Sequence, residues 1–234
     1  SGSLLGVELK DLRSEPVVYM GIKDFYPLYF EEFIWCVGIN DKIIDSLRNA
    51  WESRVAVDEF VHSKIMELFR LYLVVGGMPA AVSKYIESNN LQAVMAVQQD
   101  IIRLYKRDIA QYDPDNKLYI EEIFNLIPPE LNAKNKRFIL KKLNENAKFE
   151  RYQNSFLWLK NAGVALSVYN VEEPKIPLLL ARSHNLFKLF QNDIGLLAAQ
   201  YAEVFSCELS GGRRILILVP YTRMRLLRNW WRMV

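Results

Sequence analysis

The sequence predicts a mainly α-helical protein with a small β component. Two observations lead to this fold class. Apolar residues recur at helical intervals in two long patterns between residues 57 and 109. Between residues 119 and 183, two short helical patterns, a basic segment, a longer amphipathic helix and two β-rich runs follow one another. Helices followed by a hairpin are typical of a winged helix. We therefore expect a helical segment followed by a winged-helix domain with a β-hairpin wing.

The helical segment is predicted over residues 56–115. A long amphipathic helix from about 57 to 75 is expected to end at the GGMP string at 76–79, since glycine adopts the backbone conformations that end a helix and proline cannot continue one. A shorter helix over 80–87 and another over 91–109 follow. We interpret GGMP as a turn rather than a ligand site. The last helix carries the charged residues Arg103, Lys106, Arg107 and Asp108. They form a solvated face or, alternatively, contact nucleotide or nucleic acid.

The winged-helix-like domain is predicted over residues 116–197. Its first helix is expected to stop at Pro128 and Pro129, because proline lacks the N–H and crowds the preceding turn. A short second helix is expected over 138–143, and a third over 149–160 with a glycine cap at Gly163. Two strands, 164–171 and 176–180, are expected to form a hairpin with a polar tip at 172–175, and 182–185 is expected to be the turn after it.

Positive charge is concentrated in the third-helix region. Between residues 133 and 160 there are eight basic and two acidic residues, and eight minus two gives a net charge of +6. Such a segment attracts a nucleic acid backbone, and phosphate contacts weaken as salt rises. The alternative is the solvated face of a protein-docking module, since winged helices serve both functions. The candidate nucleic-acid-binding residues are Lys134, Lys136, Arg137, Lys141, Lys142, Lys148, Arg151, Gln153, Asn154 and Lys160.

Composition bounds the function classes. Hydrophobic content of 51% and charged content of 24% are those of a folded globular protein. The net charge of +3 is small, so an argument for nucleic-acid binding depends on the local patch. Cys36 and Cys207 form no CxxC or Cys/His cluster, which argues against a disulfide framework or a zinc site and favours a reducing setting. No apolar run reaches the roughly 18 residues of a bilayer span, and no signal-peptide pattern opens the chain. We expect a cytoplasmic location and no membrane span.

Seven strings carry a family resemblance. The string YPLYFEEF at 26–33, preceded by GSLLGV at 2–7, is followed by VVGGMPAAV at 74–82, IIRLYKRDIAQY at 101–112, IPPELNAKNKRF at 127–138, FLWLKNAGV at 156–164 and LFKLFQNDIGLL at 186–197. Over residues 1–197 the chain resembles a bacterial and archaeal family of P-loop ATPases related to AAA+ and STAND proteins. That family has an ATPase core, a helical segment, a winged helix and a C-terminal domain of unknown function that resembles PD-(D/E)XK nucleases. Val18 and Tyr29 depart from its pattern.

The resemblance implies roles for the first 55 residues. They would be the end of the ATPase core and a linker, and Ser3 would occupy the sensor-1 position that polarises the attacking water or the γ-phosphate. The alternative for Ser3 is a simple strand-end hydroxyl. No GxxxxGK[ST] string is present, so the sequence holds no phosphate-binding loop. We expect this chain alone to have no cofactor, with ATP and Mg²⁺ belonging to the intact family member, and we expect no metal site. Neither His62 nor His184 has the partners of a catalytic residue.

The last segment, 198–234, departs from the family pattern. Where a nuclease-like domain would place metal-binding carboxylates, the sequence is basic and aromatic, with Arg223, Arg225, Arg228, Trp230 and Trp231. Two explanations remain open. One is an out-of-frame or truncated reading of the gene, which the source locus would test. The other is an anchor for an anionic membrane or a nucleic acid, because arginine with tryptophan suits both.

The sequence therefore predicts a fragment of a P-loop ATP-binding protein, without its own ATPase site, whose winged helix binds DNA, another nucleic acid or a protein partner. The alternative is a protein-interaction domain that binds no nucleic acid, with the ATPase core or a second copy of the chain as its partner. In that case exposed apolar patches are expected. An independent nuclease is disfavoured because no carboxylate cluster is present. The DNA upstream of the codon for Ser1 is expected to encode a strand–GxxxxGK[ST]–helix unit.

Overall fold

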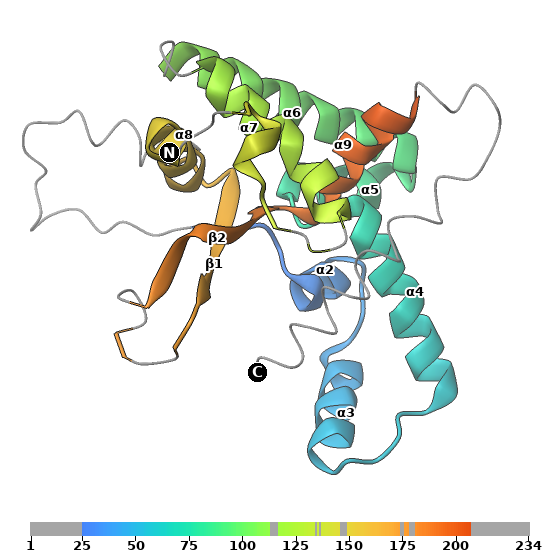
Figure 1. Cartoon of the computed structure of the whole chain (residues 1–234). Helices are drawn as coiled ribbons and strands as arrows, with labels where there is room; N and C mark the ends of the chain where they lie inside the picture. The colour runs from blue at the N-terminus through green and yellow to red at the C-terminus, as the bar shows by residue number, and fades with distance from the viewer. Residues whose placement is uncertain are drawn as a thin grey trace, which may run out of the picture. The chain divides into compact units, whose positions relative to one another are not determined.

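The computed structural model describes residues 25–112, 117–133, 135, 137–145, 149–173, 176–177 and 181–206 (Figure 1). Ser3, Val18 and the segment from residue 207 onward lie outside these residues. The described chain is mainly helical with one two-stranded antiparallel sheet, which confirms the predicted fold class. Its elements are α2 (Phe30–Cys36), α3 (Asp41–Glu52), α4 (Glu59–Val75), α5 (Pro79–Ser88), α6 (Leu91–Tyr112), α7 (Lys117–Asn132), the 3₁₀ turn η2 (Leu140–Lys142), α8 (Phe149–Asn161), β1 (Ala165–Val171), β2 (Arg182–Gln191) and α9 (Ile194–Ser206).

The chain divides into two compact units. One contains residues 103–192 and is called the α8 unit here; the other contains residues 25–102 and 193–206 and is called the α4 unit. The division falls inside α6, and the predicted boundary at residue 197 falls inside α9. The predicted domain boundaries, which follow the family resemblance, stay predictions.

Local signals set both ends of α4, much as the sequence predicts. The carboxylate of Asp58 accepts hydrogen bonds from the N–H groups of Phe60 and Val61 at 3.0 and 3.2 Å, which caps the helix N-terminus. Gly76 ends the helix with φ of +76°, a conformation that disfavours side chains. Pro79 then stands at the first position of α5, where its missing N–H has no cost. The GGMP string is thus a helix stop and turn, as predicted.

The core of the α4 unit forms where α2 and α5 pack on α4. Phe33, Ile34, Val75 and Val82 are buried together, and Leu28 packs against them. The side of α3 that reaches this core contributes Ile44. The prediction gives residues 1–55 as the end of the ATPase core and a linker, and it misses α3 as a helix.

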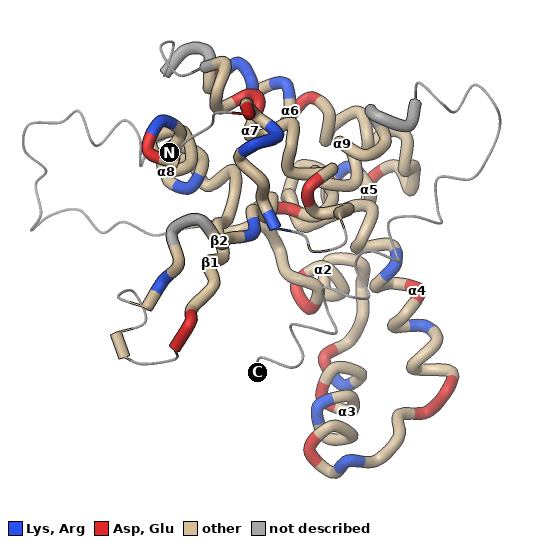
Figure 2. Tube along the Cα trace, viewed as in Figure 1, with Lys and Arg blue, Asp and Glu red and all other residues tan. Residues whose placement is uncertain are grey.

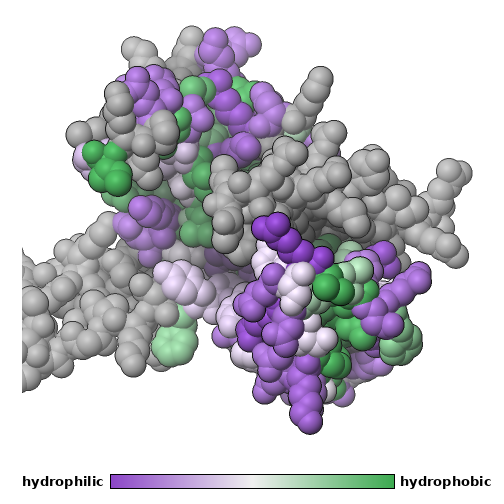
Figure 3. Space-filling model, turned by 90° about the horizontal axis from the view of Figure 1, so that it is seen from below, coloured by the Kyte–Doolittle hydropathy of each residue, from purple (hydrophilic) through white to green (hydrophobic). Residues whose placement is uncertain are grey.

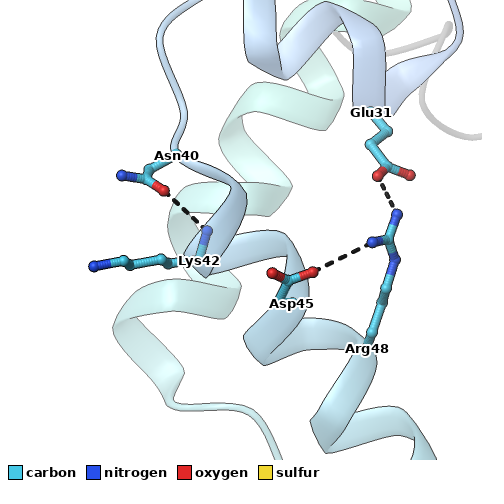
Figure 4. A network of polar contacts seen from close by, with 5 residues as sticks. All are labelled: Glu31, Asn40, Lys42, Asp45 and Arg48. Atoms are coloured by element: carbon cyan, nitrogen blue, oxygen red, sulfur yellow. Dashed lines mark hydrogen bonds and ion pairs between the residues drawn. The ribbon is translucent and has the colours of Figure 1, made fainter.

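A surface ion pair connects α3 with α2. Arg48 contacts the carboxylate of Glu31 on α2 and that of Asp45 on its own helix, the latter at 3.3 Å (Figure 4). Asn40 caps α3 by accepting a hydrogen bond from the N–H of Lys42 at 3.0 Å. Exposed pairs of this kind contribute about 0.2–1 kcal/mol each, so the buried apolar contacts carry most of the stability of this corner.

In the α8 unit, the prediction that Pro128 and Pro129 end the first helix is wrong. Helix α7 continues to Asn132, and the N–H of Ala133 still donates to the carbonyl of Pro129 at 3.1 Å. A proline costs a helix roughly 3 kcal/mol. Burial of Ile127 and Leu131, on either side of the pair, offsets that cost.

The second wing strand also differs from the prediction. Ile176 and Pro177 are exposed bends, residues 178–180 lie outside the described residues, and β2 begins at Arg182, within the predicted turn. Strand β2 pairs antiparallel with β1, from Ala165 opposite Gln191 to Tyr169 opposite Phe187. Strand β2 forms where its side chains pack into the core, since Phe187 and Leu189 are buried. Ile176 lies in a β-rich stretch of sequence, but its side chain is exposed, so no buried contact holds it in a strand.

The short second helix predicted over 138–143 is reduced to η2, a single 3₁₀ turn. Phe138 precedes it in an irregular segment, and its N–H donates to the carbonyl of Phe187 at 3.0 Å. The ring of Phe138 stacks on that of Phe187 with centroids 5.8 Å apart. The chain is therefore held against β2 at Phe138, so this residue does not begin a helix as predicted.

Candidate nucleic-acid interface

Helix α8 is predicted in the right place and is held by an aromatic core. The ring of Phe156 lies edge-on to Phe187 and Phe138, with centroids 5.1 and 5.4 Å apart. Tyr152, Ser155, Trp158 and Leu159 complete its buried side. Edge-to-face aromatic pairs of this kind add about 0.5–1.5 kcal/mol beyond area burial and fix the rotation of the helix about its axis.

The opposite side of α8 is exposed and forms one continuous face. Its residues follow the 3- and 4-residue spacing of a helix surface, and we call them the α8 face: Glu150, Gln153, Asn154, Leu157 and Lys160. Figure 2 shows basic and acidic positions side by side on α8. Within the described residues, the side chains of Gln153, Asn154 and Lys160 make no hydrogen bond or ion pair, so they are free to contact a ligand.

Arg151, another predicted contact, is exposed but engaged within the unit. Its guanidinium group donates to the hydroxyl of Tyr119 and stacks over the ring of that residue at 4.9 Å from the centroid. Tyr119 in turn packs edge-on against the buried Tyr152, with centroids 5.0 Å apart. Burial raises the pKa of Tyr152, and the neighbouring Arg151 charge partly offsets this. Arg151 therefore contributes mainly to the packing of α7 against α8.

Lys142 is also neutralised inside the protein. Its ammonium group lies 2.5 Å from a carboxylate oxygen of Glu130 on α7, and the Glu130 side chain is only 2% exposed. A buried carboxylate needs a cation nearby, because desolvation of an unpaired charge is costly. The sequence pattern predicts Lys142 to be a free positive charge, because it does not reveal that Glu130 is buried.

The remaining predicted contacts are distributed around η2. Lys141 is exposed and has no partner among the described residues. Arg137 is exposed, and its backbone N–H donates to the side chain of Asn135 at 3.4 Å. Lys134, Lys136 and Lys148 lie outside the described residues. Of the predicted contacts that the structure describes, Lys141 and Lys160 are thus the cations whose side chains have no partner among the described residues.

The β1–β2 hairpin, the predicted wing, carries acidic residues at the far end of β1. Glu172 and Glu173 are exposed, and the red positions there are visible in Figure 2. The hydroxyl of Ser183 donates to Glu172 at 3.1 Å, and Arg182 stacks over the ring of Tyr169 at 3.9 Å. Carboxylates are repelled by phosphates, so this end of the wing is not suited to a nucleic acid backbone.

A second cluster, in the α4 unit, brings together residues from distant parts of the sequence. The carboxylate of Asp193 accepts a hydrogen bond from the N–H of Gly77, and Gln98 donates to the carbonyls of Val74 and Val75 at 2.9 and 2.8 Å. The N–H of Leu28 donates to the carbonyl of Gly77 at 2.7 Å. Three of the family-like strings therefore meet here. All these polar groups satisfy one another, which indicates a structural role.

Other site classes find little support in the described residues. Within them, no three His, Cys, Asp or Glu side chains stand close enough together to hold a metal ion. His62 is exposed near the start of α4, and the side chain of His184 on β2 lies outside the described residues. Among the described helices, none alone has the length and apolar character to cross a bilayer; α4 and α5, bent by 119°, pass that test only as a pair.

Large apolar side chains are exposed at one end of the α4 unit. Trp51, Val55 and Phe60 are 67%, 65% and 81% exposed, and they lie at the end of α3, in the connection and at the start of α4. Figure 3 shows green side chains among hydrophilic ones on the face seen from below. An open hollow beside Trp35, Ile39, Asn40 and Asp41 lies nearer the start of α3. We call Trp51, Val55 and Phe60 the α3–α4 tip.

Comparison with known proteins places the chain in a family without assigning an activity. Neither the curated proteins nor the solved structures give a match to this sequence. One family model matches residues 66–205, described as a domain of unknown function, DUF8612. The match covers more than half of the chain and includes residues of both units. The chain therefore belongs to the DUF8612 family.

Proposed function

We propose that the α8 unit is a winged-helix module that binds nucleic acid through the α8 face. One observation carries the proposal: one side of α8 is buried and the opposite side is exposed. Aromatic rings hold one side rigidly, while the other presents Gln153, Asn154 and Lys160 without partners among the described residues. A rigid helix with an unpaired polar face is the element that helix-turn-helix proteins insert into a groove.

The order of elements supports the winged-helix part of the proposal. Helix α7 is followed by the segment around Phe138, which lies against β2, then by η2, α8 and the antiparallel pair of β1 and β2. A winged helix has this succession of helix, edge strand, helix, recognition helix and two-stranded wing. The second helix is the element that departs most, since it is one 3₁₀ turn.

Charge supports the nucleic-acid part. Lys141 and Lys160 are exposed cations without a partner in the described part of the chain, and Arg137 is exposed nearby in sequence. Each phosphate that a lysine neutralises releases counterions, so binding through these residues falls steeply as salt rises.

Fluorescence anisotropy of the full chain with a labelled duplex, at about 50 and 200 mM salt, tests the proposal. We expect binding at low salt that weakens at high salt. Lys141→Ala and Lys160→Ala should each reduce the slope of log affinity against log salt by about 1. Lys42→Ala, an exposed lysine on α3, is the matched control and should leave the slope unchanged. Absence of binding to any duplex or single strand at low salt would overturn the proposal.

A second candidate function is protein docking, and the α3–α4 tip favours it. Three large apolar side chains, each more than half exposed, lie within ten positions of one another. Contiguous exposed apolar surface commonly marks an interaction site. Sedimentation velocity over a range of concentrations tests self-association: docking predicts oligomers that Phe60→Lys abolishes, whereas Lys64→Glu, an exposed change on the same helix, should leave them intact. A chain that stays monomeric contradicts self-docking through this tip.

The relation to P-loop ATPases forms a further part of the proposal and is supported by the family-like strings. In the α4 unit, the strings around Leu28, Gly77 and Asp193 contact one another, as expected if they were selected together. The gene sequence preceding the codon for Ser1 tests the relation. A frame encoding a strand, a GxxxxGK[ST] loop and a helix would support it, and a frame lacking that unit would contradict it.

A further inference from the structure

The α8 face has a composition unlike that of a surface built for phosphates. It has one cation, Lys160, and one anion, Glu150, with Gln153, Asn154 and Leu157 between them. A face with no net charge gains little from the DNA backbone, and Glu150 is repelled by it. If this helix contacts nucleic acid, the central residues have the chemistry of base-edge recognition.

We propose that α8 reads adenine–thymine base pairs in the major groove of duplex DNA, with Gln153 and Asn154 on adenine and Leu157 on a thymine methyl group. This inference rests on the proposed function and assigns its substrate class. The side-chain amides of Gln and Asn each offer one donor and one acceptor, which match N6 and N7 of adenine. The thymine methyl group is the apolar feature of the major groove, and Leu157 is the apolar residue at the centre of the face.

The same geometry disfavours guanine. Guanine presents two acceptors in the major groove, and its usual partner is an arginine with two free donors. The arginine nearest the face, Arg151, donates instead to the Tyr119 hydroxyl and stacks on that ring. Lys160 stands at the last turn of the helix, seven residues beyond Gln153, where it is better placed to contact a phosphate.

Duplex RNA is disfavoured for a steric reason. The major groove of A-form RNA is deep and narrow and does not admit a helix, whereas that of B-DNA accepts one. The exposed residues span Glu150 to Lys160, about three turns, and the wide major groove of B-DNA admits such a helix.

Competition binding with the full chain tests the inference. Unlabelled duplexes of equal length, A·T-rich, G·C-rich and RNA, compete with a labelled A·T-rich probe at low salt. We expect the A·T-rich DNA to compete better than the G·C-rich DNA, by a factor of about ten for each amide side chain that contacts an adenine. Replacing adenine by 7-deazaadenine removes the N7 acceptor and should weaken binding without any change to the protein. Replacing thymine by uracil removes the methyl group and should weaken it less.

Two variants locate the preference on the helix. Gln153→Ala and Asn154→Ala should each reduce the A·T preference, while Asn125→Ala, an exposed amide on α7, should leave it intact. Equal competition by A·T-rich and G·C-rich DNA, or an A·T preference that survives both variants, would overturn this inference and leave the proposed function standing. Absence of binding to every nucleic acid would overturn both.

Discussion

The buried carboxylate of Asp193 accepts a 2.7 Å hydrogen bond from the backbone N–H of Gly77, a residue 116 positions earlier in the chain. Its second oxygen accepts from the N–H of Leu196 at 2.9 Å and so caps α9. One side chain thus ties the start of α9 to the turn that ends α4. Because the chain between the two contacts contains the α8 unit, this link closes the α4 unit around an inserted segment.

The close approach of backbones at this link gives the first prediction. A Cβ atom added at Gly77 would lie 1.9 Å from the carbonyl oxygen of Leu28, which is a backbone atom and cannot rotate away. Gly77→Ala should therefore lower the free energy of unfolding by about 3 kcal/mol, measured by urea denaturation. Gly38→Ala is the control: unlike Gly77, Gly38 has a positive φ, and its Cβ would meet open space, so only conformational strain of about 1 kcal/mol is expected. Equal losses in the two variants would contradict the packing argument.

A second prediction concerns the Asp193 carboxylate. Asp193→Ala removes the α9 cap and leaves the buried N–H of Gly77 unpaired, so we expect a loss of about 3 kcal/mol in unfolding free energy. Asp193→Asn keeps one acceptor oxygen and should lose about half as much. Thermal unfolding followed by circular dichroism measures both. Equal stability of the Ala and Asn variants would show that the two hydrogen bonds do not carry this effect.

The third prediction uses the buried Glu130. Lys142→Met should destabilise the α8 unit by about 3 kcal/mol, because it leaves a buried carboxylate without its cation; Lys142 is itself half exposed, so the value lies at the low end of the usual range. The double variant Glu130→Met with Lys142→Met removes both charges and should recover most of the loss. Urea denaturation measures the free energy of unfolding of the single and double variants. A double variant as unstable as the single one would argue against the ion pair.

A fourth prediction separates Arg151 from Lys160. Arg151 is held by Tyr119, whereas Lys160 has no partner among the described residues. Arg151→Ala should therefore lower the free energy of unfolding by about 1 kcal/mol and change nucleic-acid affinity little. Lys160→Ala should instead lower nucleic-acid affinity and change the free energy of unfolding little. Anisotropy titrations and urea denaturation on the same two proteins provide the comparison. A larger loss of affinity in Arg151→Ala would place that arginine in the interface instead.

The fifth prediction follows from Tyr152. Burial raises the pKa of its hydroxyl, so the folded state favours the neutral phenol more than the unfolded state does. The resulting stability is fully present below the ordinary tyrosine pKa of about 10 and is lost as pH rises through the higher folded value. Tyr152→Phe should lose less stability than the native chain between neutral and strongly alkaline pH. Urea unfolding at a series of pH values measures this, and parallel pH profiles of the two proteins would contradict it.

Much of the fold could be predicted because its signals are local. The turn at Gly76 and the apolar stripe of α8 are each contained within a few residues, so periodicity and end signals sufficed to predict them. The course of α7 through Pro128 and the position of β2 could not be predicted in this way. Both depend on burial against distant residues, as in the contact of Phe187 with Phe138 and Phe156.

In the candidate interface, too, local features could be predicted from the sequence and contacts between distant residues could not. Sequence alone determined that α8 would be an amphipathic helix in a basic segment, because residue spacing and charge are properties of the chain itself. Only the tertiary structure decided which of those charges are available. Arg151 lies on Tyr119 and Lys142 on the buried Glu130, whereas Lys141 and Lys160 stay unpaired among the described residues. The physical reason is that an ion pair or a cation–π contact depends on distances across the fold, which spacing along one helix does not contain.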